Sequence, residues 1–334
     1  MRLNVHVGHG KTGSSFLQSW WAINAEVLRH RHGIAYPLVA PRSGRREDAG
    51  MRGVFSMGNG FILEEVLAEP DPAAWLAQLA AGLPSGGQLL FSCERFVRSL
   101  PGQLLRLEEV AVAAGFSSVR LLLFVRDPLA HAHSLYAEMV KAHGYTGTVE
   151  DWLLLYNLHE AIEHFLEVQA LGPTLQLTAF NYSLAPTQLR KQARGWLDIP
   201  GDAPFADPPS ALVNRSLDQQ ELRALLVLNR LLGTEGRGIG RRLVRELPDL
   251  PARATVAAPE AQIRFLKRVT AAVARINAFL PPDQALRLQS LPRHDQPGDG
   301  SIRLMPDQLE VIAAELLTLG ATGVQARSPL QPSP

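Results

Sequence analysis

The sequence predicts a three-layer α/β fold, in which a parallel sheet is flanked by helices and followed by a helical C-terminal extension. Residues 119–125 (VRLLLFV) form the most apolar run of the chain, as is typical of a strand covered on both faces of a parallel sheet. The chain opens with a β-rich run, a glycine-rich turn and a stretch of helical spacing. Beyond residue 214 the pattern is helical only, so alternating strands and helices give way to helices alone.

The individual elements follow from the same periodicity. Apolar or β-rich runs predict five strands, at 3–7, 33–37, 88–93, 119–125 and 174–180. Helical spacing predicts helices between them, at 14–31, 61–68, 72–82, 101–114, 128–141 and 148–170. Residues 41–60 are rich in Gly, Arg and Ser and predict a loop long enough to be functional or mobile.

The C-terminal part is set off by composition. Proline and aspartate crowd residues 200–209, as in a linker. Further helices are expected at 217–232, 239–247, 257–279 and 306–319. We therefore expect an α/β core at 1–210, a helical extension at 211–325 that packs on it as part of one domain, and a disordered tail at 326–334.

Composition and charge narrow the class of protein. The 334 residues are 46% hydrophobic and 19% charged, which allows a large core and excludes global disorder. The net charge is 33 − 32 = +1, which excludes a bulk basic surface for nucleic acid. Cys93 is the only cysteine, so neither an intramolecular disulfide nor a cysteine-based zinc site can form. With no apolar run of roughly 18 to 20 residues and too short an apolar N-terminal stretch for a signal peptide, a soluble, cytoplasmic protein is expected.

The turn after the first strand allows two interpretations that fit poorly. Gly8, Gly10 and Gly13 match the G-x-G-x-x-G dinucleotide fingerprint, but the second strand ends without the carboxylate that holds a ribose hydroxyl. A Walker A loop needs glycine at position 5, where Val5 stands, and an aspartate suited to magnesium is not evident. Lys11 and the hydroxyls that follow it favour a dense anion such as phosphate or sulfate. A P-loop kinase remains the second interpretation.

The loop fits a third interpretation better. Residues 6–18 (HVGHGKTGSSFLQ) resemble the 5′-phosphosulfate loop of sulfotransferases that use 3′-phosphoadenosine 5′-phosphosulfate (PAPS), written Lys-Thr-Gly-Thr-Thr, then an aromatic or small residue, then Leu. Serines replace the two threonines here, and glycine stands where proline is usual. The resemblance implies a P-loop NTPase-like sheet, PAPS as co-substrate without a metal, and nucleotide contacts from Gly10, Lys11, Thr12, Gly13, Ser14 and Ser15.

A second stretch, 126–136 (RDPLAHAHSLY), resembles the family's 3′-phosphate motif. It has arginine at a strand end, proline two residues on, and serine eight after the arginine. Arg126 offers a planar fork for bidentate phosphate contact, and Ser134 lies about two turns along the next helix. Asp127 and Pro128 fit an N-cap followed by a first-turn proline.

Two softer resemblances lie further on. Residues 214–217 (NRSL) look like the segment after the sheet in bacterial carbohydrate-type sulfotransferases. Residues 236–242 (GRGIGRR) would be a basic loop over the adenosine 3′-phosphate, although a solvated turn explains them equally well.

The family's reaction moves a sulfuryl group to a hydroxyl or amine and needs a cation and a base. Lys11 is the candidate for the charge on the leaving phosphate. Glu94, at the end of the strand 88–93, is the leading candidate for the base, because Ser92-Cys93-Glu94 resembles a Ser-Ser-Glu stretch of glycan-type relatives. The competing bases are His9, His131 and His133.

The sequence therefore predicts a bacterial-type sulfotransferase that acts on a carbohydrate, a glycolipid or another small hydroxylated acceptor. Its rivals are a P-loop kinase and a catalytically silent nucleotide-binding relative. The acceptor is not specified. Four arginines of the loop 41–60 suit an anionic head group, although a mobile, solvated loop explains them as well: Arg42, Arg45, Arg46 and Arg52. Trp20 and Trp21 are expected in the core.

Overall fold

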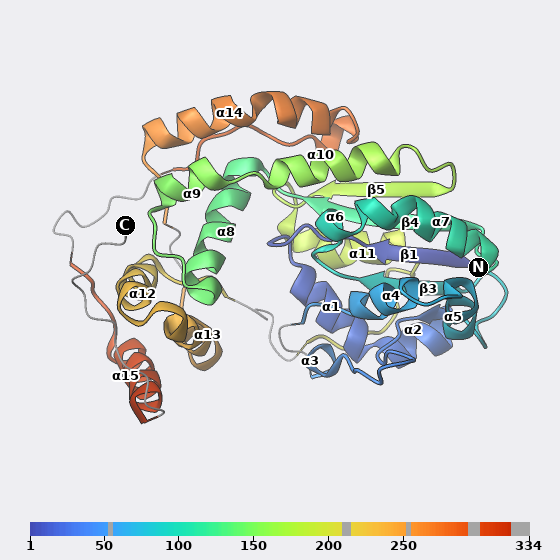
Figure 1. Cartoon of the computed structure of the whole chain (residues 1–334), viewed down its shortest axis with the longest axis horizontal. Coiled ribbons are helices and arrows are strands. Elements are labelled where there is room, and N and C mark those ends of the chain that lie inside the picture. The colour runs from blue at the N-terminus through green and yellow to red at the C-terminus, as the bar shows by residue number, and fades with distance from the viewer. Residues whose placement is uncertain (53–55, 209–214, 252–254, 293–300, 322–334) are drawn as a thin grey trace. The chain divides into compact units, whose positions relative to one another are not determined.

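The computed structural model describes residues 1–52, 56–208, 215–251, 255–292 and 301–321 (Figure 1). The chain forms two compact units that interleave along the sequence. The first contains Met1–Asp127, Asn157–Val213 and Val269–Arg287. The second contains Pro128–Tyr156, Asn214–Arg268 and Leu288–Pro334.

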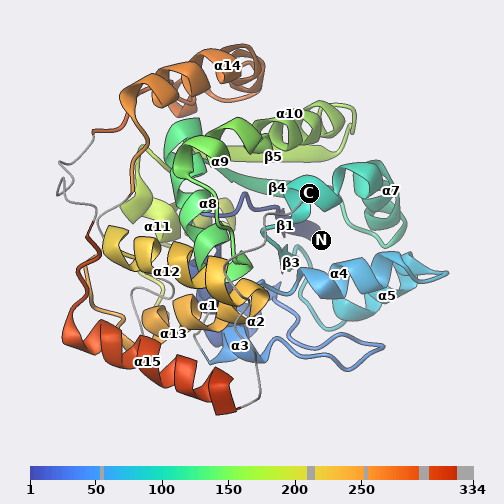
Figure 2. The same ribbon diagram turned by 60° about the vertical axis from the view of Figure 1, so that its left-hand side comes forward.

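The first unit is built on a five-stranded parallel sheet with the order β2-β3-β1-β4-β5. Figure 2 shows β5, β4, β1 and β3 in this order from top to bottom. The strands are β1 (Arg2–His6), β2 (Ile34–Ala35), β3 (Gln88–Ser92), β4 (Ser118–Val125) and β5 (Leu175–Asn181). Val5 pairs with Phe91 on one side and with Leu121 on the other, and all three are fully buried. The five predicted strands and the parallel α/β class are confirmed.

Helices cover both faces of this sheet. One hydrophobic cluster joins α1, α2 and α11 to β3 and β4, and it contains Trp20 and Trp21, as predicted. Helices α6, α7 and α10 pack together on the other side, where α7 contacts β4. The helices of this unit are α1 (Ser14–Ile23), α2 (Ala25–His32), α3 (Asp48–Met51), α4 (Gly60–Leu67), α5 (Pro72–Leu79), α6 (Phe96–Ser99), α7 (Leu104–Ala113), α10 (Leu158–Gln169) and α11 (Leu189–Trp196), with the short 3₁₀ turns η1 (Pro101–Gln103), η2 (Pro186–Gln188) and η4 (Pro282–Gln284).

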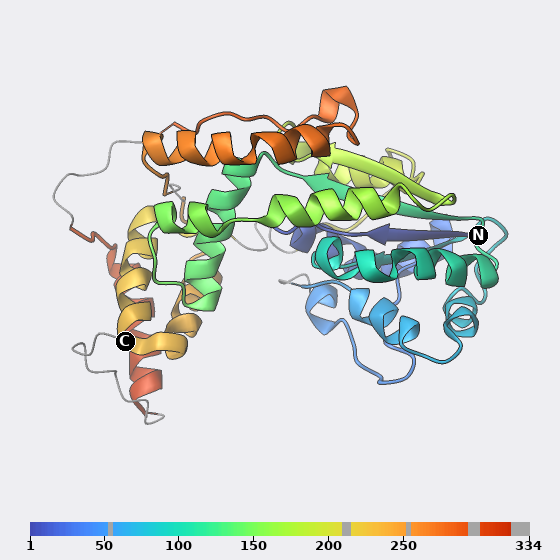
Figure 3. The same ribbon diagram turned by 45° about the horizontal axis from the view of Figure 1, so that its top comes forward.

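The second unit is helical in the residues that the structure describes. Its helices are α8 (Pro128–His143), α9 (Val149–Leu155), α12 (Gln219–Leu232), α13 (Arg237–Glu246) and α15 (Pro306–Ala321), with the 3₁₀ turn η3 (Gly233–Gly236). Helix α14 (Pro259–Asn277), orange in Figure 3, is continuous although its residues divide between the two units after Arg268.

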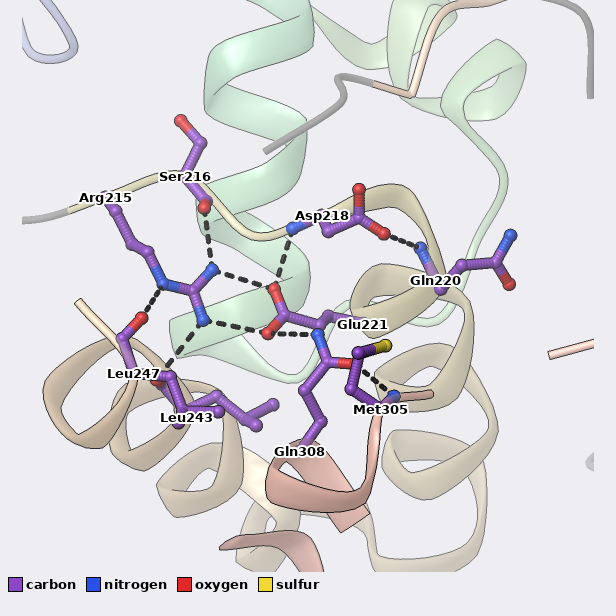
Figure 4. Close-up of polar contacts among 9 residues, drawn as sticks. All are labelled: Arg215, Ser216, Asp218, Gln220, Glu221, Leu243, Leu247, Met305 and Gln308. Carbon is purple, nitrogen blue, oxygen red and sulfur yellow. Dashed lines mark hydrogen bonds and ion pairs between the residues drawn. The ribbon is translucent and has the colours of Figure 1, made fainter. Parts of the chain in front are cut away.

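A buried ion pair holds three helical segments of this unit together (Figure 4). The guanidinium of Arg215 donates to both carboxylate oxygens of Glu221, each over 2.8 Å. It also donates to the carbonyl oxygens of Leu243 and Leu247 around the end of α13. From α15, Gln308 donates to the same carboxylate over 3.0 Å.

Several boundaries differ from the predicted ones. The predicted helix 14–31 breaks at Asn24, whose side chain donates to the carbonyl oxygens of Trp20 and Ala206. The predicted helical stretch 148–170 consists of two helices, α9 and α10, which are separated at residues 156–157, where Tyr156 is extended. Helix α11 was not predicted.

The predicted basic loop 236–242 is wrong. Residues from Arg237 onward form the first turns of α13. The expected division into a core at 1–210 and an extension at 211–325 stays a prediction. The tail predicted at 326–334 lies outside the described residues. Among the described helices, none is both long and apolar enough to cross a membrane.

Candidate functional site

The loop between β1 and α1 contains three residues with a left-handed backbone. Gly8, Lys11 and Gly13 have φ angles of 82°, 64° and 83°. A Cβ at Gly8 would lie 2.4 Å from the carbonyl oxygen of Glu94, so only glycine lets the loop pass this close to the end of β3. Lys11 adopts a conformation that costs a non-glycine residue free energy and that concentrates at functional sites.

The N-terminus of α1 presents its first amides without a side-chain cap. Gly13 is the N-cap residue, and no side chain makes a capping hydrogen bond there. Ser14 is buried, and its hydroxyl has no hydrogen-bond partner among the residues that the structure describes. Ser15 follows it and is half-buried. Unpaired N–H groups and the helix dipole favour negative charge, so this end of α1 suits a phosphate or sulfate.

Thr12 uses its hydroxyl inside the loop. The Oγ1 atom donates to the carbonyl oxygen of His9 over 2.5 Å, and the side chain is fully buried. This bond closes the turn around Gly10 and Lys11. The hydroxyl proton of Thr12 is therefore committed to the shape of the loop.

Arg126 reaches the loop from the end of β4. Its Nη1 donates to the carbonyl oxygen of Lys11 over 3.0 Å, across 115 positions of sequence. The guanidinium also lies over the ring of Tyr182, 5.6 Å from its centroid. Both Lys11 and Arg126 are half-buried. The two predicted cations are thus brought to one loop.

Glu94 approaches the same loop from the end of β3. A Cβ built at Gly10 would lie 3.7 Å from the Oε2 atom of Glu94, which is ordinary van der Waals contact. Glu94 is half-buried. The leading candidate for the base therefore faces Gly10, next to the residue predicted to neutralise the leaving group.

His9 is held neutral inside the loop. Burial, with a smaller contribution from the positive charges of Arg126 and Arg98, lowers the pKa of this fully buried imidazole to about 3. A base of that pKa accepts a proton poorly near neutral pH. Arg98, on α6, is a third cation near the loop and was not predicted from sequence. Its position four residues after Glu94 places it near the end of β3.

Three predicted residues lie on α8, in the second unit. Ser134 is half-buried, and its pairing with Arg126 stays a prediction from sequence spacing. Both ring nitrogens of His133 are used, because Nδ1 lies 2.8 Å from the carbonyl oxygen of Leu129 and Nε2 accepts from the backbone N–H of Ala257. His133 thus holds the structure and has no nitrogen available as a base. The Nδ1 of His131, also buried, is 2.8 Å from the hydroxyl of Tyr156.

Several buried polar side chains near the loop were not predicted from sequence. Ser92 donates its backbone N–H to Asn59, and its hydroxyl is 2.8 Å from Nδ1 of His6. Gln18 is fully buried one turn after Ser14, and neither polar atom of its amide has a partner among the described residues. A Cβ at Gly58 would lie 2.8 Å from the Nε2 of Gln18, so this part of the loop 41–60 packs against α1.

The arginines of the loop 41–60 bind neighbouring side chains. Three of them have partners within the same unit: Glu69 for Arg42, the ring of Phe61 for Arg45, and Asp48 for Arg46. The buried Glu47 accepts hydrogen bonds from Ser56 and Gly50 and anchors the loop. These contacts account for most of the basic character that suggested an anionic acceptor.

Comparisons with known proteins give only distant likenesses. No family model matches the sequence, and no curated protein does. A crystal structure of a sulfotransferase from Alicyclobacillus acidocaldarius aligns with a TM-score of 0.40 at 13% identity, over 83% of this chain and 94% of that chain. A retinol dehydratase in complex with androsterone and inactive cofactor PAP aligns with a TM-score of 0.34 at 14% identity, over 86% of this chain and 82% of that chain. TM-scores below 0.5 establish neither fold nor activity, so the function is inferred from the residues of the chain itself.

Proposed function

We propose that this chain is a sulfotransferase that moves a sulfuryl group from PAPS to a hydroxyl or amine of a small acceptor in the cytoplasm. The observation that supports it best is the meeting of Lys11, Arg126 and Glu94 at one loop. Arg126 donates to the carbonyl oxygen of Lys11 over 3.0 Å, and the Glu94 carboxylate faces Gly10. Cations, exposed helix amides and a carboxylate at one place serve the transfer of an anionic group.

One buried hydroxyl at the β1–α1 loop supports the binding of a sulfated nucleotide. The Ser14 hydroxyl is buried without a partner at the N-terminus of α1, where an anionic oxygen would complete its hydrogen bonds. We assign Ser14, Ser15 and the amides of residues 10–13 to the phosphosulfate, and Arg126 to the 3′-phosphate. Ser134 joins Arg126 in this role on its spacing alone.

The nucleotide supplies an activated sulfuryl group when it is bound. Glu94 then accepts the proton of the acceptor hydroxyl while the hydroxyl oxygen of the acceptor bonds to sulfur. As the S–O bond to the nucleotide breaks, the Lys11 ammonium would stabilise the negative charge that grows on the departing phosphate oxygen. His9 keeps the surroundings polar without adding charge, because its pKa is lowered to about 3.

Binding of the nucleotide product separates this proposal from the kinase alternative. Adenosine 3′,5′-bisphosphate without magnesium should raise the melting temperature, since a ligand that binds only the folded state stabilises it. Arg126→Ala should weaken this binding at least about tenfold, because a bond to a charged group contributes about 1.5 to 3 kcal/mol. Arg106→Ala, an exposed arginine on α7, is the matched control. Stabilisation only by ATP with magnesium would favour a kinase.

The hydrogen bonds of Asp127 argue against the kinase alternative. Asp127 follows β4, where a magnesium carboxylate would be expected, but its Oδ1 accepts hydrogen bonds from the Asn181 side chain and from the Arg287 backbone, each over 2.9 Å. These bonds give the carboxylate a structural role.

Transfer itself is tested with radiolabelled sulfate on PAPS and a panel of carbohydrates, glycolipids and small alcohols. Glu94→Gln should lower turnover about a hundredfold while binding of adenosine 3′,5′-bisphosphate is retained. Glu109→Gln, an exposed glutamate on α7, is the matched control. Nucleotide binding without transfer to any acceptor would favour the silent relative.

A further inference from the structure

A pocket lies in the second unit, where the end of α8 meets α12 and α13. Its walls include His143 at the end of α8, Gly144 and Thr146 just after it, and Asn229, Arg230 and Arg237 from the other two helices. These three helices contact one another in this unit. The pocket is open to solvent and has a volume of about 340 Å³, within the range of ligand sites and enough for a monosaccharide.

The pocket carries two positive charges that the described residues do not neutralise. Arg237 makes no hydrogen bond or ion pair within the described part of the chain, and Arg230 donates only to the carbonyl oxygen of Thr146, over 3.0 Å. Glu235 in η3 forms no ion pair with either arginine among the described residues, and Glu315 on α15 pairs with Arg242 over 2.9 Å. The guanidinium groups therefore remain for an anion.

Arg237 stands at the start of α13, directly after the 3₁₀ turn η3. The helix has ten residues, its N-cap is Gly236, and neither a side-chain cap nor an acidic residue occurs in its first turn. Arg237, a pocket residue, is its first residue. Gly144 opposes it with a left-handed φ of 72°, and a Cβ there would lie 3.6 Å from the Nε of Arg237. The Arg237 side chain thus lies beside Gly144 at the edge of the pocket.

Asn229 indicates that the ligand carries more than a negative charge. Its Nδ2 donates to the carbonyl oxygens of Val140 and Tyr145, over 2.9 and 3.3 Å, which fixes the orientation of the amide. The Oδ1 atom faces Gly236, 3.0 Å from a Cβ built there. This residue is 2% exposed, and Oδ1 has no partner among the described residues. A buried acceptor without a donor calls for a hydroxyl or N–H from a ligand.

We propose that this pocket binds an acidic sugar, with its carboxylate or sulfate ester on Arg230 and Arg237 and a ring hydroxyl donating to Oδ1 of Asn229. The pocket is distinct from the predicted 3′-phosphate ligand on the same helix. Ser134 lies nine residues before His143 on α8, which is about 13 Å along the helix axis. The inference does not depend on the proposed sulfotransferase activity.

Calorimetric titration of the full chain tests the ligand class. Glucuronate and glucose 6-sulfate should each bind saturably and compete with each other. Glucose lacks the anion and inorganic sulfate lacks the hydroxyl, so each should bind at least tenfold more weakly. Absence of saturable binding by both acidic sugars would overturn the proposal, and so would inorganic sulfate that binds as tightly as glucose 6-sulfate.

Three variants that each replace an arginine by glutamine locate the binding site. Arg237→Gln and Arg230→Gln should each lower the affinity for glucuronate about tenfold, as expected for a lost bond to a charged group. Arg264→Gln, an exposed arginine on α14 outside the pocket, should leave it unchanged. Circular dichroism and thermal unfolding verify that all three fold. Equal affinities in Arg237→Gln and the wild type would place the ligand elsewhere.

Lys11→Ala separates this inference from the proposed function. Glucuronate should bind this variant as it binds the wild type. Loss of binding in Lys11→Ala would assign the sugar to the β1–α1 loop and reject the second pocket. Sugar binding in a chain that transfers no sulfate would reject only the proposed function.

Discussion

Two regions of this chain bury polar side chains, but they differ in whether those side chains have hydrogen-bond partners. In the second unit, the side chains of Arg215 and Glu221 are 2% and 0% exposed, and the guanidinium makes five hydrogen bonds (Figure 4). At the β1–α1 loop of the first unit, Ser14 and Gln18 are also buried, yet the Ser14 hydroxyl and the Gln18 amide lack partners among the described residues.

This difference indicates that the Arg215 cluster serves stability and that the β1–α1 loop serves ligand binding. A buried polar group without a partner costs about 1 to 3 kcal/mol. The Arg215 cluster avoids this cost, since Glu221 also accepts from the backbone of Asp218 and from Gln308. At the β1–α1 loop the buried groups carry this cost in the free chain, and a bound ligand would supply the missing hydrogen bonds. Removal of a group should therefore lower stability in the first region and ligand handling in the second.

The largest effect is expected from Arg215→Met. It leaves the Glu221 carboxylate buried without its counter-ion, which costs about 3 to 5 kcal/mol. Urea unfolding followed by circular dichroism measures the loss.

A double variant identifies the cause of that loss. Arg215→Met with Glu221→Leu removes both charges, so the chain should be more stable than with Arg215→Met alone. A single variant within 1 kcal/mol of the wild type would mean that the cluster is not a source of stability.

Lys11→Met tests the opposite side of the comparison. The ammonium is proposed to act on charge that grows in the transition state, so turnover should fall about 10²- to 10³-fold. The free energy of unfolding should change by less than about 0.5 kcal/mol, because the side chain is only half-buried. Lys191→Met, an exposed lysine on α11, should change neither quantity. A large loss of stability without a specific loss of turnover would make Lys11 structural.

The pH dependence of stability tests how His9 is held. The folded chain keeps this imidazole neutral down to a pKa of about 3, whereas the unfolded chain takes up a proton near pH 6.5. The unfolded state then binds more protons, so the free energy of unfolding falls as the pH drops below 6.5. His9→Gln should reduce this slope by up to about 1.4 kcal/mol per pH unit between pH 6 and 4. Equal slopes in urea titrations of both proteins would show that His9 is accessible to protons.

The fold could be predicted where local pattern decides it. The apolar run 119–125 gave β4, and the glycine and serine pattern placed the β1–α1 loop before α1. Asn24 breaks the first predicted helix through bonds to Ala206, which lies 182 positions away. Helix α11 (LRKQARGW) was missed because only Leu189, Ala193 and Trp196 are buried in an otherwise polar stretch.

The residues of the candidate site also differ in whether local sequence predicts their role. Lys11, Arg126 and Glu94 each end or follow an apolar strand, a position that sequence reveals. The role of His133 depends on the backbone of Ala257, 124 positions away, and no local pattern contains it. Side chains that act through a distant partner therefore need the structure.

Ser14→Ala should have the smallest effect and is the sharpest test of the comparison. Because the hydroxyl is buried without a partner among the described residues, its removal should raise the free energy of unfolding by about 1 kcal/mol. The same change should weaken binding of adenosine 3′,5′-bisphosphate about tenfold, since a bond to an anionic oxygen is lost. Ser99→Ala, an exposed serine on α6, controls for the loss of a hydroxyl. A variant that loses both stability and affinity would mean that the Ser14 hydroxyl is bonded inside the folded chain, and the contrast with Arg215 would then disappear.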